Sequence, residues 1–275
     1  AIEFNTAVSH ISLDWVVVDH YALNSIWHTM IKSFDRQIMV IDDLADRRLL
    51  CDLLLNQNFG ACPEKYKGKL LTKDTISLLG SNFALLRNEF IEWRDFSYAR
   101  RVSNDTVNRV LINFGGSDSE NFTLQVLKKL ETSNVAKRLA FDIILGPLFS
   151  DTNSIQKFVQ NSTLDITVYI QPTNIAEIMS YADICIGAAG SSALERCCIG
   201  LPTILIVIAD NQLDIAEKLS QKNISYLSDI SNITSDFNKF SSMSYEQLKV
   251  YINNSVNVCT GTGVMSVATV MKRQK

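Results

Sequence analysis

The stretch of residues 183–212, DICIGAAGSSALERCCIGLPTILIVIADNQ, combines residue types that could hold a phosphate group. An apolar strand, DICIG, runs into the small-residue turn AAG, and Ser191 or Ser192 can cap the helix that follows. The free backbone N–H groups at such a junction can receive a phosphate, because small residues let it come close. Ser192 and Glu195 also have the S-x-x-E spacing of a capping box, which is a purely structural alternative.

A second junction of this kind is NFGGSDSEN, at residues 113–121, where a strand runs into Gly115 and Gly116 and then into polar residues that open a helix. Taken alone, a Gly-Gly pair is equally well explained as a simple turn. Two such junctions in one domain could face the two ends of a diphosphate, which favours a nucleotide ligand. The G-x-G-x-x-G, P-loop and G-x-S-x-G patterns are absent, which argues against hydride transfer, ATP hydrolysis and serine hydrolase chemistry.

Amide side chains follow predicted strands at two further places. Asn211 and Gln212 come after the strand TILIVIA, where amides could hold sugar substituents or phosphate oxygens, or could simply begin the next helix. The NQN segment at residues 56–58 also ends a strand. We expect it to line a cleft.

The elements that must position these residues alternate between strands and helices. The strands DWVVVDHY, QIMVIDD and CDLLLNQN predict a partial N-terminal Rossmann-like domain over residues 1–105, because the chain opens almost directly on a strand that looks internal. The charged, non-periodic stretch 93–109 predicts a domain boundary. Residues 106–275 then predict a complete doubly wound domain, whose last helix packs back on the N-terminal domain. Within it we expect the strands FDIILG and DITVYI to follow one another directly.

Composition narrows the class of protein. With 275 residues, 47% hydrophobic and 20% charged, the chain reads as globular α/β, and a net charge of -3 without basic clusters argues against a nucleic-acid partner. Its apolar runs, such as residues 203–209, are far shorter than the roughly 20 residues of a membrane span. The short runs lead us to expect no membrane partner. The six cysteines lack metal-ligand spacing, so we expect no metal site, and as reduced core thiols they suggest a cytoplasmic location. An incomplete first domain would expose apolar sheet surface, so we also expect homo-oligomerisation or low solubility.

Six segments, in order, resemble one known family. They are VVVDHYAL, IDDLADRRLLCDLLLNQNFG, LLGSNFALLRNEF, NFGGSD, IGAAGSSALERCCIGLP and ADNQ. Together they are similar to the UDP-2,4-diacetamido-2,4,6-trideoxy-β-L-altropyranose hydrolases of pseudaminic acid biosynthesis. The resemblance implies an α/β, GT-B-like fold of two Rossmann-like domains facing a cleft, and a UDP-sugar substrate. It also implies attack of water on the anomeric carbon with inversion, without a cofactor or metal.

The resemblance implies a residue set for the C-terminal domain. The diphosphate would meet the turn before the helix at Ser192, Glu195 would accept hydrogen bonds from the ribose hydroxyls, and uracil would lie near two isoleucines. The implied UDP-binding residues are Gly190, Ser191, Ser192, Glu195, Ile170 and Ile175. The implied contacts to sugar or diphosphate are Gly115, Gly116, Ser117, Asp118, Asn211 and Gln212, with Asp118 on the sugar side because a carboxylate repels a diphosphate.

In the N-terminal domain the resemblance points to His20 and Tyr21 as catalytic residues, with the tyrosine ordering the attacking water or the sugar. The residues alone favour a packed, hydrogen-bonded histidine at position 20, just beyond a strand. Family members carry a G-x-G-H-x-x-R element whose histidine is the general base, and His10, His20 and His28 do not follow such a pattern. We therefore expect either a fragment or a natural short form with impaired hydrolysis. The alternatives are a GT-B glycosyltransferase that uses a UDP-sugar and a catalytically dead UDP-sugar-binding protein.

Overall fold

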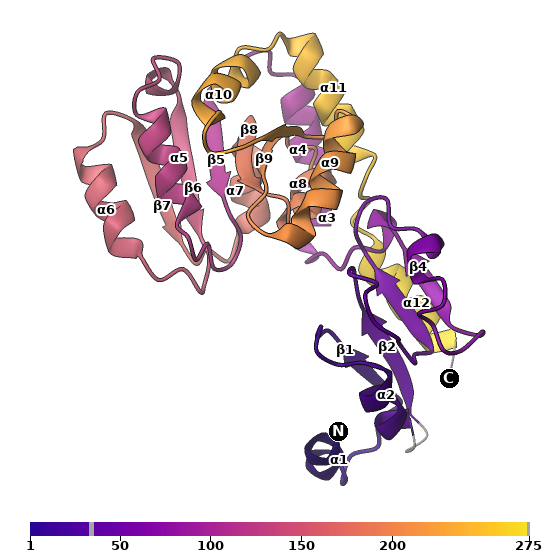
Figure 1. Cartoon of the computed structure of the whole chain (residues 1–275). Coiled ribbons are helices and arrows are strands. Elements are labelled where there is room, and N and C mark those ends of the chain that lie inside the picture. Colours follow the sequence, from indigo (N-terminus) through magenta and orange to yellow (C-terminus); the bar gives the residue numbers. More distant parts are fainter. Residues whose placement is uncertain (33–35, 274–275) are drawn as a thin grey trace. The chain divides into compact units, whose positions relative to one another are not determined.

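The computed structural model describes residues 1–32 and 36–273, which form two compact α/β units (Figure 1). Unit 1 comprises Ala1–Leu85 and Thr262–Lys275, and unit 2 comprises Leu86–Gly261. Each unit is built on one sheet whose paired strands all run parallel. The predicted α/β class is confirmed. Among the described residues, no helix combines the length and apolar character that crossing a bilayer requires.

Unit 1 has a four-stranded sheet in the order β1-β2-β3-β4. Its strands are short and almost entirely apolar, as expected of parallel strands covered on both faces. The three strands expected in this region are present, and a fourth, β4, pairs with β3. The strands are β1 (Trp15–Val18), β2 (Gln37–Ile41), β3 (Leu53–Asn56) and β4 (Ile76–Leu79).

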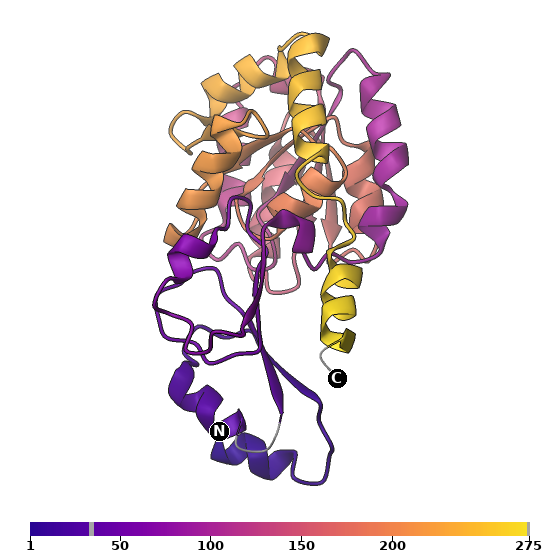
Figure 2. The same cartoon turned by 90° about the vertical axis from the view of Figure 1, so that its right-hand side faces the viewer.

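Alternate residues of these strands point into two separate cores. Val40 and Leu54 face a cluster that includes Ile31 of α2 (Ser25–Lys32), whereas Met39 and Leu55 face the other side. That second face is covered by α12 (Gly263–Arg273), the yellow helix beside the strands in Figure 2. The last helix therefore belongs to unit 1. The remaining short helices of unit 1 are α1 (Ile2–Ala7), η1 (Pro63–Tyr66) and η2 (Ser81–Phe83).

Unit 2 has a six-stranded sheet in the order β10-β9-β8-β5-β6-β7. The chain starts in the middle at β5, builds outward through β6 and β7, and then returns to the other side of β5 with β8. This reversal makes the β5–β8 boundary a topological switch point, the place where open α/β sheets bind ligands. The strands are β5 (Arg109–Asn113), β6 (Ala140–Leu145), β7 (Asp165–Ile170), β8 (Ile184–Ala188), β9 (Thr203–Ile206) and β10 (Tyr226–Ser228).

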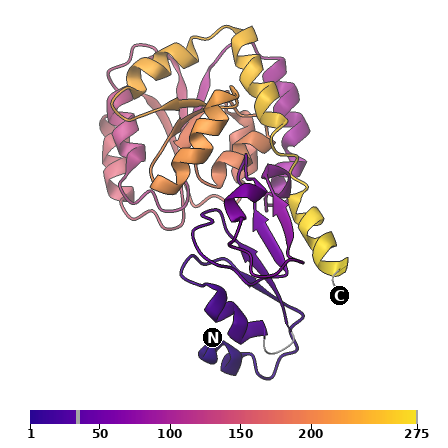
Figure 3. The ribbon, with the colours of Figure 1, turned by 45° about the vertical axis from the view of Figure 1, so that its right-hand side comes forward.

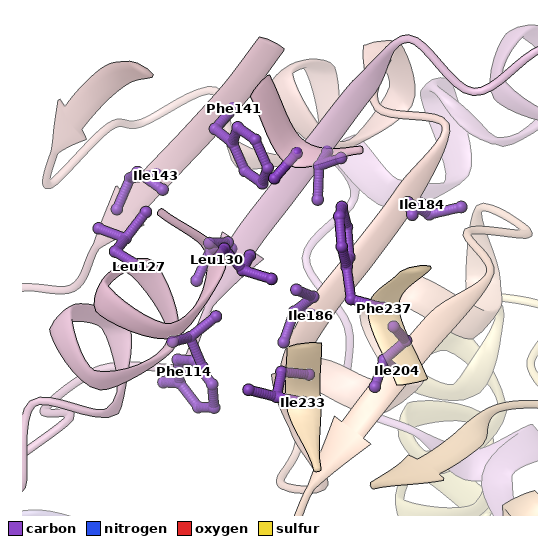
Figure 4. Packing of buried hydrophobic residues seen from close by; sticks show 14 of the residues in the cluster. Phe114, Leu127, Leu130, Phe141, Ile143, Ile184, Ile186, Ile204, Ile233 and Phe237 are labelled. Atoms are coloured by element: carbon purple, nitrogen blue, oxygen red, sulfur yellow. The ribbon is translucent and has the colours of Figure 1, made fainter. Parts of the chain in front are cut away.

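Helices flank the unit 2 sheet on both sides (Figure 3). On one face Phe141 and Ile186 pack with Leu127 and Phe237 from two helices (Figure 4). A helix also separates the strands FDIILG and DITVYI, which the sequence prediction placed in direct succession, because parallel strands need a crossover connection. The helices are α5 (Phe122–Leu130), α6 (Thr152–Asn161), α7 (Ile175–Tyr181), α8 (Ser192–Cys198), α9 (Leu213–Gln221), α10 (Ile233–Ser241) and α11 (Tyr245–Val256), with η3 (Ala136–Arg138) and η4 (Asp210–Gln212).

The charged stretch that we interpreted as a domain boundary forms α3 (Glu89–Glu92) and α4 (Arg94–Val102) of unit 2. Arg101 is buried and donates to the carbonyl oxygens of Met179 (2.6 Å), Ile199 (2.6 Å) and Ala182 (2.9 Å). Arg94 donates to the carbonyl oxygens of other loop and helix ends in unit 2. These arginines satisfy backbone carbonyls at the ends of helices. The units therefore divide between residues 85 and 86, not at residue 105.

Candidate functional site

A pocket of about 400 Å³ opens at the switch point between β5 and β8. All of its lining residues belong to unit 2, and most come from the carboxyl ends of the strands and the loops that follow, with Ser192 and Glu195 in α8 and Arg87 just before α3. The lining residues are Arg87, Asn113, Phe114, Gly115, Gly116, Ser117, Ile144, Gly146, Pro147, Ile175, Ala188, Gly190, Ser191, Ser192, Glu195, Ile208 and Gln212. The two loops singled out in the sequence are therefore brought together around one space.

The first of these loops joins β8 to α8 at Gly190 and Ser191. A Cβ atom at Gly190 would lie 3.4 Å from Gln212 Nε2, an ordinary van der Waals contact, so the turn passes close to that amide. Ser191 is the N-cap residue of α8 and makes no side-chain capping bond. Ser192 Oγ instead accepts a hydrogen bond from Arg196 Nη1 at 3.2 Å. The capping-box alternative for Ser192 and Glu195 is thus wrong.

The second loop follows β5, and glycines after two neighbouring strands, β5 and β6, determine its shape. Gly115 has a φ of 89°, which favours glycine. A Cβ atom at Gly146, after β6, would lie 2.4 Å from the carbonyl oxygen of Gly116, so only glycine allows this approach. Sequence reasoning missed Gly146, because nothing in FDIILG shows which loop the strand end will touch.

Asp118 belongs to the start of α5 and does not line the pocket. Its buried carboxylate accepts hydrogen bonds from the N–H groups of Phe122 (2.7 Å) and Thr123 (3.0 Å) and from Thr123 Oγ1 (2.6 Å). These bonds satisfy the free N–H groups at the beginning of a helix. The carboxylate oxygens are used inside the protein, which leaves little capacity for the sugar contact implied by the resemblance.

Glu195 and Arg87 form the charged part of the pocket. Arg87 Nη2 lies 3.6 Å from Glu195 Oε1, and Arg87 Nη1 lies 2.7 Å from Glu89 Oε1. The guanidinium also stands over the Phe90 ring, 5.3 Å from its centre. Burial raises the pKa of Glu195, while Arg87 and Arg196 partly counteract that rise. The pocket thus offers a carboxylate acceptor beside a guanidinium donor.

Sequence reasoning did not assign a role to Arg87, although it quoted the segment LLGSNFALLRNEF that contains it. The signal available was an arginine directly after an apolar run and two residues before a glutamate. Its partner Glu195 lies far along the chain. Only the fold places the two side chains together.

The remaining predicted residues of unit 2 divide between the pocket and its surroundings. Ile175 lines the pocket, but Ile170, at the end of β7, does not and is 49% exposed. Gln212 lines the pocket and its Oε1 accepts a hydrogen bond from the Ile208 N–H at 3.3 Å. Asn211 is exposed and does not line the pocket.

Tyr21 belongs to a second polar cluster, in unit 1, at the carboxyl ends of β1, β2 and β3. Its hydroxyl donates to Asp43 Oδ1 at 2.9 Å, and Asn58 Nδ2 donates to Asp43 Oδ2 at 3.2 Å. Asp43, which sequence reasoning missed, thus orients Tyr21. His20 is exposed, and its Nδ1 accepts from the Ala22 N–H at 3.1 Å, so it is not a packed histidine.

The two other amides of the NQN segment stabilise unit 1 itself. Asn56 is buried and donates to the hydroxyl of Tyr66 at 3.0 Å, and Gln57 Oε1 accepts from the Leu85 N–H at 2.9 Å. Within the described part of the chain, no group of three or more His, Cys, Asp or Glu side chains is placed to hold a metal ion.

Residues 110–241, just under half of the chain, match the glycosyltransferase family 28 C-terminal domain. An uncharacterised protein of Methanocaldococcus jannaschii is 24% identical over 229 residues, which cover 80% of this chain and 46% of that protein. A Helicobacter pylori protein is 24% identical over 230 residues, which cover 82% of this chain and 40% of that protein. Its name is pseudaminic acid cytidylyltransferase and UDP-2,4-diacetamido-2,4,6-trideoxy-beta-L-altropyranose hydrolase. The chain spans less than half the length of these curated relatives.

Two solved structures resemble the chain over almost its whole length. The UDP-GlcNAc 2-epimerase of Neisseria meningitidis, bound to UDP-GlcNAc, has a TM-score of 0.63 at 15% identity and covers 98% of this chain and 80% of its own. MurG of Acinetobacter baumannii has a TM-score of 0.61 at 12% identity, with coverages of 98% and 77%. At such low identities the likeness shows the fold alone. The chain has the GT-B fold, and its second unit matches the glycosyltransferase family 28 C-terminal domain over residues 110–241.

Proposed function

We propose that the chain is a UDP-sugar hydrolase that binds UDP-2,4-diacetamido-2,4,6-trideoxy-β-L-altropyranose, with its UDP moiety in the unit 2 pocket. The observation that carries this proposal is the convergence of two glycine-containing loops with Glu195 and Arg87 at the switch point of the sheet. A volume of about 400 Å³ falls within the roughly 300–1,000 Å³ of small-molecule sites.

Each part of UDP has a counterpart in the pocket chemistry. The diphosphate would lie between the Gly115–Gly116 loop and the Gly190–Ser192 turn. The glycines there have no side chains, so a phosphate group can come close to the backbone. Glu195 would accept hydrogen bonds from the two ribose hydroxyls, because a carboxylate offers acceptors only. Arg87 would donate to a phosphate oxygen, for which a guanidinium is well suited.

Uracil would pack against Ile175, the apolar lining residue at the start of α7. Ile170 is exposed beside the end of β7 and would contact uracil only at its edge.

The proposed reaction breaks the bond between the anomeric carbon and the β-phosphate oxygen. A water oxygen forms the new bond to that carbon from the opposite face, and UDP leaves with the electron pair of the broken bond. A base must accept one proton from the water. Tyr21, oriented by Asp43, would order the water or the sugar, and His20 is the first candidate for a substitute base.

Loss of a positioned general base typically lowers rates by about 10²–10⁴. Residues 1–275 contain no Gly-x-Gly-His element, so we expect slow hydrolysis by this chain. The H. pylori relative, whose name includes this hydrolase activity, supports the proposed reaction. The match to glycosyltransferase family 28 favours a second candidate, transfer of the sugar to an acceptor.

Phosphorus NMR of the diacetamido UDP-sugar with stoichiometric protein tests the proposal directly. We expect free UDP to appear over hours, and to appear more slowly with Glu195→Ala. Glu217→Gln, an exposed glutamate on α9 outside the pocket, is the matched control and should behave as the wild type.

Three other outcomes are informative. Broadened substrate signals without UDP release would indicate a binding protein without catalysis. Release of UDP only after an acceptor is added would indicate a glycosyltransferase. Unchanged spectra at millimolar ligand would show that the pocket does not take this nucleotide sugar.

A further inference from the structure

Arg196, on α8, is a buried cation directly behind the pocket wall. Its side chain is only 1% exposed, and among the residues that the structure describes it takes part in no ion pair within 4.0 Å. Nη2 donates to the Ala188 carbonyl oxygen, and Nη1 donates to Ser192 Oγ at 3.2 Å. The buried Nε has no hydrogen-bond partner. A charged group in this setting is incompletely compensated.

Arg101 shows how a second buried arginine of unit 2 is accommodated. It is 3% exposed, and its guanidinium donates to the carbonyl oxygens of Met179, Ile199 and Ala182 and to the hydroxyl of Ser97. Buried charges are costly unless such partners are provided. Arg196 has fewer partners than Arg101, so a nearby anion would stabilise it more.

Both groups that Arg196 contacts through hydrogen bonds, Ala188 and Ser192, line the pocket. The guanidinium lies against Gly187, where a Cβ atom would be only 2.9 Å from Nη1. The absence of a side chain at Gly187 therefore makes room for the cation between β8 and α8. Its hydrogen-bond partners are themselves part of the pocket wall.

The contact with Ser192 also sets the direction of the serine hydroxyl. Because Ser192 Oγ accepts a hydrogen bond from a guanidinium, which can only donate, its own proton is left to donate elsewhere. Ser192 lines the pocket, so this proton is available to a ligand oxygen. The arrangement suits an anionic acceptor and disfavours a cation.

We propose that Arg196 is a positioning residue for the diphosphate: it orients the Ser192 hydroxyl as a donor and supplies a fixed positive charge behind the wall. This inference rests on the proposed function, because it takes the anion that the pocket would bind to be the diphosphate of UDP. Glu195 and Arg87 are the other charged groups of the pocket, and Arg87 alone is exposed enough to be screened by salt.

Calorimetric titration of the full chain with UDP, uridine and inorganic pyrophosphate tests the inference. We expect Arg196→Met to weaken UDP and pyrophosphate binding about 30-fold while uridine affinity stays within about twofold, because only the anions use the charge. Arg196→Lys should recover most of the affinity for UDP. Arg101→Met, which removes an equally buried guanidinium away from the pocket, should leave UDP affinity within about twofold.

Equal weakening of UDP and uridine by Arg196→Met would overturn the inference, since it would reveal a general structural role. If that variant does not fold by circular dichroism, Ser192→Ala decides: a loss of about fivefold or more for UDP and none for uridine supports the inference, and equal losses overturn it. If the wild type binds pyrophosphate but not UDP, the proposed function fails and Arg196→Met still tests the anion site. If the wild type binds neither UDP nor pyrophosphate, both proposals are wrong.

Discussion

Unit 1 and unit 2 are both parallel α/β sheets, yet they treat the carboxyl ends of their strands differently. In unit 2 these ends are followed by glycines and serines, and an open pocket remains. In unit 1 they are followed by larger polar side chains that bond to one another, as Tyr21, Asp43 and Asn58 do. Small residues leave room for a ligand, whereas paired side chains fill the same edge with protein.

The units also differ in their buried ionisable groups. The chain has three histidines, and all lie in residues 1–85 of unit 1. His28 is fully buried there, whereas the buried charges of unit 2 include the arginines Arg101 and Arg196. Acid should therefore affect the folding of unit 1 and the ligand binding of unit 2, each through a different group.

The largest effect that the comparison predicts is on Glu195. We expect Glu195→Gln to weaken UDP binding about 100-fold, because two charge-assisted hydrogen bonds become neutral ones. The same change should raise the free energy of unfolding, since the raised pKa of Glu195 shows that its charged form is disfavoured by burial. Calorimetry and urea unfolding measure the two effects.

The raised pKa also predicts a pH dependence of binding. Wild-type affinity for UDP should fall as the pH drops through a value above the ordinary range for a glutamate, and Glu195→Gln should abolish that fall. Glu217→Gln on α9 is the control. Undiminished binding by Glu195→Gln would mean that unit 2 holds its ligand by other residues.

The second prediction concerns the acid stability of unit 1. Burial, helped by the nearby Arg47, lowers the pKa of His28 to about 4. In the unfolded chain this histidine has a pKa near 6.5. The stability that neutral His28 contributes to the folded state is therefore fully present above pH 6.5 and is lost as the pH falls toward 4. The loss should be on the order of 3 kcal/mol by pH 4.

Urea unfolding followed by tryptophan fluorescence at several pH values tests this. His28→Gln keeps an acceptor for the Leu50 N–H. It should make the free energy of unfolding depend less on pH between pH 6.5 and 4. His20→Gln is the matched control, since His20 is exposed. If the free energy of unfolding falls equally with acid in the wild type and in His28→Gln, other groups cause the loss of stability.

A smaller effect is expected at the polar cluster of unit 1. Tyr21→Phe and Asp43→Asn should each cost up to about 1 kcal/mol of stability, and the double variant should cost less than their sum because they share one hydrogen bond. A double-mutant cycle in urea measures this coupling. Neither change should alter UDP affinity by more than about twofold, and a larger change would mean that UDP binding depends on unit 1.

The smallest effect is expected on deleting unit 1 altogether. Residues 86–261 contain every lining residue of the pocket and their own apolar core, so they should fold alone and bind UDP within about threefold of the full chain. Circular dichroism and calorimetry test this. Loss of binding by a well-folded unit 2 would show that the pocket is incomplete without the rest of the chain.

Several features of this protein could be read from local sequence. Apolar runs such as residues 203–209 predicted buried strands, because parallel strands covered on both faces need apolar residues throughout. The two glycine- and serine-containing loops could be located because each directly follows its strand. Nine of the twelve residues named in unit 2 line the pocket: Gly115, Gly116, Ser117, Ile175, Gly190, Ser191, Ser192, Glu195 and Gln212.

Other features depended on partners far along the chain. Charge in residues 93–109 predicted a domain boundary, but Arg101 bonds to carbonyl groups 78 to 98 residues away, which no local pattern reveals. Asp118 was expected on the sugar side of the ligand, although its carboxylate is used by the next helix.

The sequence by itself determined where strands, turns and small residues fall, because backbone geometry and burial act over a few residues. Only the tertiary structure decided which strand ends meet, and so which side chains share one space. Arg87 and Glu195 are neighbours because α3 packs on α8, and Gly146 and Gly116 are neighbours because β5 and β6 pair. Such contacts join segments that are far apart in the sequence. They form only when the whole apolar surface of the sheet is buried.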